Sequence, residues 1–304
     1  MLVQAAAAAA AGQQYPAPAL YVVATPIGNL ADLSFRALHV LATVDAIACE
    51  DTRHSARLLE HFGLSRPLLA VHEHNERDAA GAVLARLAKG ERVAYISDAG
   101  TPAVSDPGAA LVAAVRDAGF RVLPIPGPSS ALAALSVAGD TRGEGFEVVG
   151  FLPARGAERT RALARCAAAA PTQVLFEAPH RIEVLAAALG KACPQRVVTV
   201  CRELTKQFET VATLTAQDLP AWLAADPNRA RGEFAVVLHA LAGADADADA
   251  NDEDHDALLR PLLAALPLKQ AVALAAEIGG APRNVLYARA LVLKGEASPA
   301  SAAD

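Results

Sequence analysis

Three segments of the chain combine glycine and proline with short polar side chains directly after an apolar, strand-like run. The longest, residues 97–108, reads S-D-A-G-T-P-A-V-S-D-P-G and follows the β-branched run 92–96. Glycine lets a ligand approach the backbone closely, proline fixes the loop, and short polar side chains bind polar groups. Because ligands of open α/β sheets bind beyond the carboxyl ends of the strands, this segment predicts a ligand-binding loop. A capped turn between a strand and a helix is the alternative.

Two shorter segments have the same character. The sequence P-I-G-N follows a predicted first strand at residues 19–25, and P-G-P-S-S follows another at residues 121–125. Ser129 and Ser130 stand at the start of a helix, where their hydroxyls can cap that helix or bind a ligand. A further segment, E-D-T-R-H at residues 50–54, carries more charge than a turn needs, and a solvated turn with local ion pairs is its alternative.

Several common catalytic and binding motifs are absent from the sequence. No G-x-G-x-x-G follows a strand, and neither a phosphate-binding P-loop nor a G-x-S-x-G nucleophile elbow occurs. His72 and His74 have no third ligand at suitable spacing, which argues against a metal site. The four cysteines lack C-x-x-C spacing, and Cys49 and Cys201 lie in strand-like runs, so we expect buried thiols and a reducing compartment.

The hydrophobic pattern predicts an α/β fold with two consecutive domains. In residues 18–140, helical segments alternate with short apolar runs, which favours a mainly parallel sheet with strands at 19–25, 45–49, 68–71, 92–96 and 121–125. A glycine-rich break at residues 139–145 predicts a domain boundary. Further runs predict a second sheet in residues 145–241, with hairpins among its late strands. Charged loops that face each other across two domains form a cleft, the usual place for a ligand.

The two ends of the chain differ in composition from the rest. The alanine-rich residues 1–17 predict a disordered tail, and no segment is long and apolar enough to span a membrane, so we expect a cytoplasmic protein. The formal net charge is −6, but residues 242–256 carry seven acidic side chains and predict a solvated linker. Residues 257–296 are basic and predict short helices that resemble a helix-turn-helix, for binding RNA or for docking on the core or a partner subunit.

Seven ordered motifs carry a family resemblance: T-P-I-G-N-L, A-C-E-D-T-R-H-S, S-D-A-G-T-P-A-V-S-D-P-G, P-G-P-S-S-A, G-F-L-P, F-E-A-P-H-R and R-E-L-T-K. On these motifs, residues 20–240 closely resemble the bacterial small-subunit ribosomal RNA 2′-O-ribose methyltransferases of the tetrapyrrole-methylase superfamily. The C-terminal P-L-K-Q-A-V-A-L-A-A-E-I-G-G also resembles the tail of these enzymes. The aspartate run and the alanine-rich N-terminus look like additions of this sequence.

The resemblance implies a fold, a cofactor and a reaction. It implies two α/β domains of tetrapyrrole-methylase type with S-adenosylmethionine in the cleft between them, a small C-terminal helical appendage, and a homodimer. The implied reaction is methyl transfer to a cytidine ribose in the decoding region of 16S ribosomal RNA. The positions that would meet the cofactor fall on Pro26, Asp98, Ala99, Gly100, Thr101, Val104, Ser129, Ser130, Glu177 and Leu204.

Polar residues at strand ends are the candidates for the chemistry. Methyl transfer from a sulfonium needs in-line approach, and a ribose hydroxyl is a poor nucleophile that a nearby base or cation would help. The candidates are Lys206, Glu203 and Asp98, although a lysine accepts a proton only if burial lowers its pKa. Phosphates and 2′-hydroxyls of the RNA are expected to contact Arg53, Arg155, Arg159, Arg181 and Arg202.

Two other functions are compatible with parts of the sequence. A superfamily relative could methylate a tetrapyrrole or a modified protein side chain, but the E-D-T-R-H and F-E-A-P-H-R segments and the basic C-terminal region argue against it. The other is a catalytically silent ribosome-assembly or RNA-binding protein. The intact glycine-containing loops argue against that function.

Overall fold

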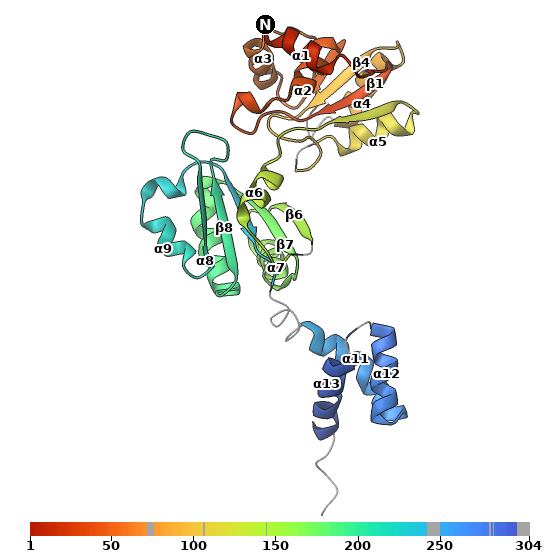
Figure 1. Cartoon of the computed structure of the whole chain (residues 1–304), viewed down its shortest axis with the longest axis vertical. Coiled ribbons are helices and arrows are strands. Elements are labelled where there is room, and N and C mark those ends of the chain that lie inside the picture. Colours follow the sequence, from red (N-terminus) through yellow and green to blue (C-terminus); the bar gives the residue numbers. More distant parts are fainter. Residues whose placement is uncertain are drawn as a thin grey trace, which may run out of the picture.

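The computed structural model describes residues 1–71, 76–105, 107–143, 145–241, 250–279, 281 and 283–296. Two α/β domains follow one another along the chain, and a group of helices ends it (Figure 1). The α/β class, the order of the two domains and the C-terminal helices are therefore confirmed. Among the described residues, no helix has both the length and the apolar character needed to cross a membrane.

The first domain is built on a five-stranded parallel sheet. Its strands are β1 (Ala19–Val23), β2 (Ala46–Cys49), β3 (Leu68–Ala70), β4 (Arg92–Ile96) and β5 (Arg121–Ile125). They lie in the order β3-β2-β4-β1-β5 and follow the predicted apolar runs closely. β5 contains Pro124, which an edge strand tolerates because one of its sides makes no ladder hydrogen bonds.

Helices cover both faces of this sheet (Figure 1). On one face, α2 (Phe35–Thr43) and α3 (Thr52–His61) share a core with the strands. On the other face, α4 (Glu76–Leu87) and α5 (Ala109–Asp117) pack against Tyr95 of β4. The predicted helix cap at Asn75 lies outside the described residues.

The alanine-rich N-terminus differs from the expected disordered tail. Residues Leu2–Ala10 form helix α1, and Ala6 is fully buried in the core that α1 shares with α2. Alanine has the highest helix propensity of the twenty residues, and its small side chain lets two helices approach closely. The composition that suggested disorder therefore also suits this packing.

The second domain is built on a mixed sheet. Its strands are β6 (Phe146–Phe151), β7 (Thr172–Glu177), β8 (Val197–Arg202), β9 (Thr210–Thr215) and β10 (Phe234–Leu238). In the order β6-β7-β10-β8-β9, β6 and β7 are parallel and the other neighbours are antiparallel, so the predicted hairpin character of the late strands is confirmed. One core of this domain joins the sheet to α7 (Gly156–Ala168), α8 (Ile182–Ala192) and α9 (Leu219–Ala224).

Helix α6 (Ser130–Ala138) also packs on the second sheet, although it precedes the glycine-rich break where the sequence predicts the domain boundary. Its buried Ala131, Ala134 and Ala138 contact strands β7, β8 and β10. By packing, the two domains therefore meet at residues 126–129, and Figure 1 shows α6 at the second domain. Helical periodicity marks an apolar face but does not say which sheet that face covers.

The C-terminal domain consists of α11 (Ala250–Ala265), α12 (Leu268–Gly279) and α13 (Arg283–Glu296). α11 begins at Ala250 rather than near Leu258, so part of the expected acidic linker is helical, whereas residues 242–249 lie outside the described residues. Asp256 accepts hydrogen bonds from Arg289 Nε at 2.7 Å and Arg260 Nη2 at 3.1 Å. These bonds hold the pKa of Asp256 below its usual range, and the bond from Arg289 joins α13 to α11.

A buried polar network joins the ends of the second sheet. Asp140 Oδ2 accepts hydrogen bonds from Thr172 Oγ1 at 2.7 Å and from the Ala240 amide at 2.6 Å. The His239 ring lies between Asp140 Oδ1, 3.8 Å from its Nδ1, and Thr199 Oγ1, 2.7 Å from its Nε2. Burial lowers the pKa of His239 below its usual value of 6.5, even though Asp140 favours the charged imidazole.

Lowering the pH is therefore expected to destabilise the second domain through protonation of His239. As the pH falls below 6.5, the unfolded chain binds this proton more readily than the folded one, so the free energy of unfolding decreases. Urea unfolding of the wild type and of His239→Gln, measured from about pH 7.5 down to about pH 5, checks this expectation. The variant should show a flatter pH dependence, and parallel curves for the two proteins would contradict it.

Candidate functional site

Three loops converge at the carboxyl ends of β4, β1 and β5, which are neighbours in the first sheet. Thr25 and Gly100 form an isolated antiparallel bridge, in which Thr25 N donates to Gly100 O at 2.9 Å and Gly100 N donates to Thr25 O at 3.0 Å. Thr101 Oγ1 donates to Pro128 O at 3.0 Å and ties the third loop to the other two. Direct hydrogen bonds therefore join the three segments that the sequence singles out.

Two glycines are needed for the path of the longest loop. Gly100 has a φ of +79°, which L residues with a side chain rarely adopt. Gly108 has a φ of +130°, and a Cβ at this position would collide with the ring of Tyr95. Tyr95 Oη donates to Pro107 O at 2.6 Å, so the loop folds back onto the strand that it leaves.

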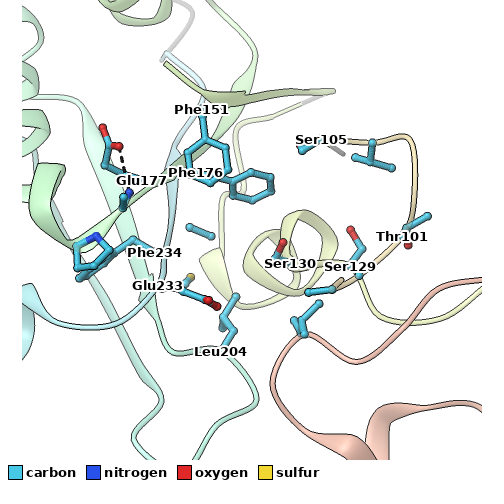
Figure 2. Close-up of a pocket in the computed structure, with 18 residues that line it drawn as sticks. Thr101, Ser105, Ser129, Ser130, Phe151, Phe176, Glu177, Leu204, Glu233 and Phe234 are labelled. Carbon is cyan, nitrogen blue, oxygen red and sulfur yellow. Dashed lines mark hydrogen bonds between the residues drawn. The ribbon is translucent and has the colours of Figure 1, made fainter. Parts of the chain in front are cut away.

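A pocket of about 430 Å³ lies between these loops and the second sheet (Figure 2). The first domain lines it with Ile27, Ala99, Gly100, Thr101, Val104 and Ser105. The second sheet and α6 line it with Ser129, Ser130, Phe151, Phe176, Glu177, Ala178, Pro179, Cys201, Leu204, Glu233, Phe234 and Ala235. Its volume and its place between two domains are typical of a small-molecule site.

Most residues that the resemblance assigns to the cofactor line this pocket, including Leu204 in the second domain. Pro26 and Asp98 do not line it, but their neighbours Ile27 and Ala99 do. Asp98 Oδ1 instead accepts a hydrogen bond from the Asp51 amide at 3.2 Å. Asp98 therefore joins the loop after β4 to the charged segment that follows β2.

The two serines stand where α6 begins, beside the pocket (Figure 2). Ser129 is the N-cap residue, yet its hydroxyl makes no capping hydrogen bond. The first amides of a helix also lack partners within that helix. The Ser129 hydroxyl therefore makes no hydrogen bond to the first amides of α6, which favours ligand binding over capping as its role.

Three aromatic side chains of the pocket wall were not selected from the sequence: Phe151, Phe176 and Phe234. The ring centroids of Phe151 and Phe176 lie 5.7 Å apart, and Phe151 is 59% exposed. Aromatic faces of this kind suit stacking with a flat heterocycle. The signal that could have found them is the position of Phe151 and Phe176 within the G-F-L-P and F-E-A-P-H-R motifs at strand ends.

Glu177 holds a fully buried carboxylate between two arginines. Its Oε2 accepts a hydrogen bond from Arg159 Nη2 at 2.9 Å, and its Oε1 lies 2.9 Å from Arg181 Nε. Arg159 Nη1 also donates to Pro153 O at 3.1 Å, and Arg181 Nη2 donates to Leu152 O at 2.7 Å. The two guanidinium groups thereby fasten the end of β7 to the segment that follows β6.

Two of the arginines assigned to RNA are therefore engaged within the protein. Reversing the charge of Arg159 would disturb the pocket wall together with any RNA contact, so such a variant does not separate the two roles. Arg53 and Arg155 are exposed, and Arg202 is half-buried with its Nη1 3.4 Å from Arg231 O. All five arginines stay predictions as RNA contacts, and Arg53 and Arg155 are the two that are exposed.

The candidate residues Lys206 and Glu203 are bonded to each other. Lys206 Nζ donates to Glu203 Oε1 at 3.0 Å and to Glu233 Oε2 at 2.9 Å. Burial disfavours the ammonium, but the two carboxylates outweigh burial and raise the pKa of Lys206 above its usual value. Burial also opposes the charge on Glu203, yet bonds from the Glu233 amide and Lys206 hold its pKa below the usual range. Lys206 therefore stays protonated at neutral pH and does not meet the condition for a lysine base.

Cys201 lines the pocket but is not a nucleophile. Desolvation raises the pKa of its thiol to about 12, and the thiolate is the reactive form. All four cysteines are free, and Cys49, Cys166 and Cys201 are buried. In the part of the chain that the structure describes, no three histidine, cysteine or acidic side chains gather as metal ligands, while His72 and His74 lie outside that part.

Known proteins match both parts of this chain. Residues 19–220 match the family model of tetrapyrrole (corrin/porphyrin) methylases, and residues 249–294 match the model described as RsmI C-terminal HTH domain. The relative from Pseudomonas aeruginosa named ribosomal RNA small subunit methyltransferase I is 48% identical over 91% of this chain and 98% of its own. Its counterpart of the same name from Escherichia coli O157:H7 is 45% identical over 91% and 96%.

Solved structures share the fold. A diphthine synthase matches with a TM-score of 0.56 at 17% identity, over 73% of this chain and 90% of its own. A cobalt precorrin-4 methyltransferase matches with a TM-score of 0.54 at 18% identity, over 72% and 94%. Such low identities concern the fold alone, whereas the family model spans more than half of this chain. The chain therefore belongs to the tetrapyrrole methylase family.

Proposed function

We propose that this S-adenosylmethionine-dependent methyltransferase methylates the 2′-hydroxyl of a cytidine ribose in the decoding region of 16S ribosomal RNA. The observation that carries the proposal is the high identity, across the pocket domains and the helical domain, to relatives named ribosomal RNA small subunit methyltransferase I. The fold neighbours at 17% and 18% identity, a diphthine synthase and a cobalt precorrin-4 methyltransferase, show the fold alone and do not indicate the substrate of this chain.

The pocket suits S-adenosylmethionine in size and in chemistry. Its volume is about 430 Å³, its aromatic wall suits an adenine ring, and Gly100 lets polar atoms approach the backbone. When bound, the cofactor supplies a methyl group on a cationic sulfonium. The residues that would hold it are Ala99, Gly100, Thr101, Val104, Ser129, Ser130 and Leu204. Pro26 would act by positioning the loop after β1. Glu177 would act by positioning Arg159 and Arg181.

The contribution of the chain to the reaction is mainly positional. Correct orientation of the methyl donor and the hydroxyl supplies much of the acceleration in such a transfer. The fixed ammonium of Lys206 can stabilise negative charge that develops on a hydroxyl oxygen as its proton leaves. Asp98 and Glu203, which precede the pocket residues Ala99 and Leu204, are the carboxylate candidates to receive this proton, and the lowered pKa of Glu203 disfavours it in that role.

The helical domain and exposed arginines of the α/β domains are proposed to hold the RNA. Lys269, Arg283 and Lys294 are exposed on α12 and α13. Arg53 and Arg155 are exposed on the two α/β domains. Contacts of such cations with phosphates provide affinity and set the register of the RNA, and contacts with 2′-hydroxyls distinguish RNA from DNA.

Transfer of a labelled methyl group tests this proposal. Purified small ribosomal subunits that lack the modification are incubated with the protein and with S-adenosylmethionine labelled on its methyl group. One labelled cytidine ribose in the decoding region is expected after nuclease digestion and mapping. A protein that binds the cofactor but leaves the RNA unlabelled would contradict the proposal and favour the tetrapyrrole or protein substrate.

We also propose that the enzyme is a homodimer, as the family resemblance implies, and that it acts in the cytoplasm, where its ribosomal substrate is found. The edge strand β6 supports a dimer because Phe146 and Val148 are 51% and 36% exposed on it. Light scattering on the purified protein is expected to give twice the mass of one chain. The mass of a single chain at micromolar concentration would contradict a stable dimer.

A further inference from the structure

We infer that Lys206 is a positioning residue that joins the two domains beside the pocket and sets the separation of the two pocket walls. The inference rests on the proposed function only in taking this pocket as the site of methyl transfer. It concerns how the chain keeps that pocket in shape, so it does not depend on which RNA nucleotide is modified.

The first observation is the path of the Lys206 side chain over the first domain. Gly28 belongs to the loop after β1, and a Cβ built on it would lie 2.6 Å from Lys206 Cγ and 2.7 Å from Lys206 Cε. The methylene stem of a second-domain residue therefore rests on the bare backbone of the first domain. Lysine stems commonly cover apolar or backbone surface in this way while the charged end binds elsewhere.

The second observation is the anchoring of the ammonium group in the second domain. Glu203 and Glu233 bind Nζ at 3.0 Å and 2.9 Å, and the side chain of Lys206 is 26% exposed. The two glutamates are also joined to each other, because the Glu233 amide donates to Glu203 Oε1 at 2.9 Å and the Glu203 amide donates to Glu233 O at 3.0 Å. The ammonium is thus fixed to the ends of β8 and β10 together.

The third observation is backbone strain in the turn that carries Lys206. Glu203 and Thr205 have φ values of +53° and +67°, which are uncommon for residues with a Cβ. Strain of this kind persists only where surrounding contacts determine the conformation, and it concentrates at functional sites. Here the strained turn carries the Lys206 side chain whose stem lies against Gly28.

These contacts lie next to both walls of the pocket. Gly28 follows Ile27 in the chain, and Ile27 lines the pocket from the first domain. Leu204 and Glu233 line it from the second domain, and Figure 2 shows them across the pocket from Thr101. Lys206 therefore connects the two pocket walls at their edge. Because its ammonium is protonated and bound to two glutamates, it suits a structural link between the domains better than a proton acceptor.

The test compares Lys206→Met with the matched control Lys191→Met in the full-length protein. Methionine keeps most of the stem length and removes the charge, and Lys191 is an exposed lysine in the last turn of α8. Hydrogen exchange of the amides in residues 25–30 of the first domain is expected to become faster in Lys206→Met only. The dissociation constant for S-adenosylmethionine should rise about tenfold, and Lys206→Arg should recover part of the loss.

Glu233→Gln serves as a second variant because the Glu233 side chain is 78% exposed and its replacement leaves the core untouched. Glu233→Gln should also speed amide hydrogen exchange in residues 25–30 and raise the dissociation constant for S-adenosylmethionine, each by less than Lys206→Met does. Unchanged exchange in residues 25–30 and unchanged cofactor affinity in Lys206→Met, with methyl transfer lost, would overturn the inference, because Lys206 would then act only on the acceptor hydroxyl and not on the shape of the pocket. A wild type without affinity for S-adenosylmethionine would count against the proposed function, whereas the exchange measurement would still test the structural link between the domains.

Discussion

Replacing Glu177 by glutamine is expected to lower the free energy of unfolding of the second domain by about 3 kcal/mol. The carboxylate has no exposed area and neutralises Arg159 and Arg181, both of which also hold backbone carbonyls after β6. Glutamine has nearly the same shape, so the variant removes charge without opening a cavity. It leaves two guanidinium groups, 13% and 20% exposed, without their counter-ion. Breaking a buried pair from one side is costly for this reason.

Glu177→Gln should alter the shape of the pocket as well as the stability of the second domain. Glu177, Ala178 and Pro179 line it, and Phe151 precedes the segment that the two arginines hold. Urea unfolding and the affinity for S-adenosylmethionine therefore both report on Glu177→Gln. Glu183→Gln is the control, because Glu183 is an exposed carboxylate in the first turn of α8 and its loss should cost about 0.5 kcal/mol or less. Equal unfolding midpoints for the wild type and Glu177→Gln would contradict the structural role assigned to this carboxylate.

The strands and the ligand-binding loops could be predicted from the sequence because their signals are local. The run from Arg92 to Ile96 is β-branched and apolar, and glycine and proline directly after it leave few alternatives to a loop at a strand end. The same holds for the turns that begin with Pro26 and Pro126. Parallel pairing then brings these loops together without further information, since parallel strands share one carboxyl edge.

Features that depend on tertiary contacts could not be predicted in this way. The alanine face of α6 reads as a helix of the first domain, and only the packing shows that it covers the second sheet. Phe234 has the pattern of an ordinary strand core residue and belongs to none of the seven motifs, so its place in the pocket wall is visible only in the fold. The pairing of Glu177 with Arg159 spans 18 residues and two elements, beyond any helical or strand spacing. For that reason the sequence alone assigns Arg159 to RNA and does not reveal its bond to Glu177.

Removing residues 242–304 is expected to leave cofactor binding intact and to weaken binding to the small ribosomal subunit by about tenfold or more. Within the described residues, the cores of the two α/β domains contain no side chain beyond residue 241, and the C-terminal helices pack around a core of their own. The pocket is likewise lined only by residues up to Ala235. Cofactor affinity by calorimetry and subunit affinity at several salt concentrations measure the two effects separately.

A full-length variant that loses only positive charges tests whether the basic side chains of the C-terminal domain contact the RNA. Lys269, Arg283 and Lys294 are exposed, whereas Arg289 is paired with Asp256, so replacing the first three by glutamine leaves the ion pair between α11 and α13 in place. Each phosphate contact that is lost should reduce the slope of log affinity against log salt by about 0.7 to 0.9. If the truncated chain binds poorly while the triple variant keeps both affinity and salt slope, the domain acts by another surface. Leu274, Ile278 and Leu291, which are 38%, 62% and 50% exposed on α12 and α13, would then be the residues to replace next.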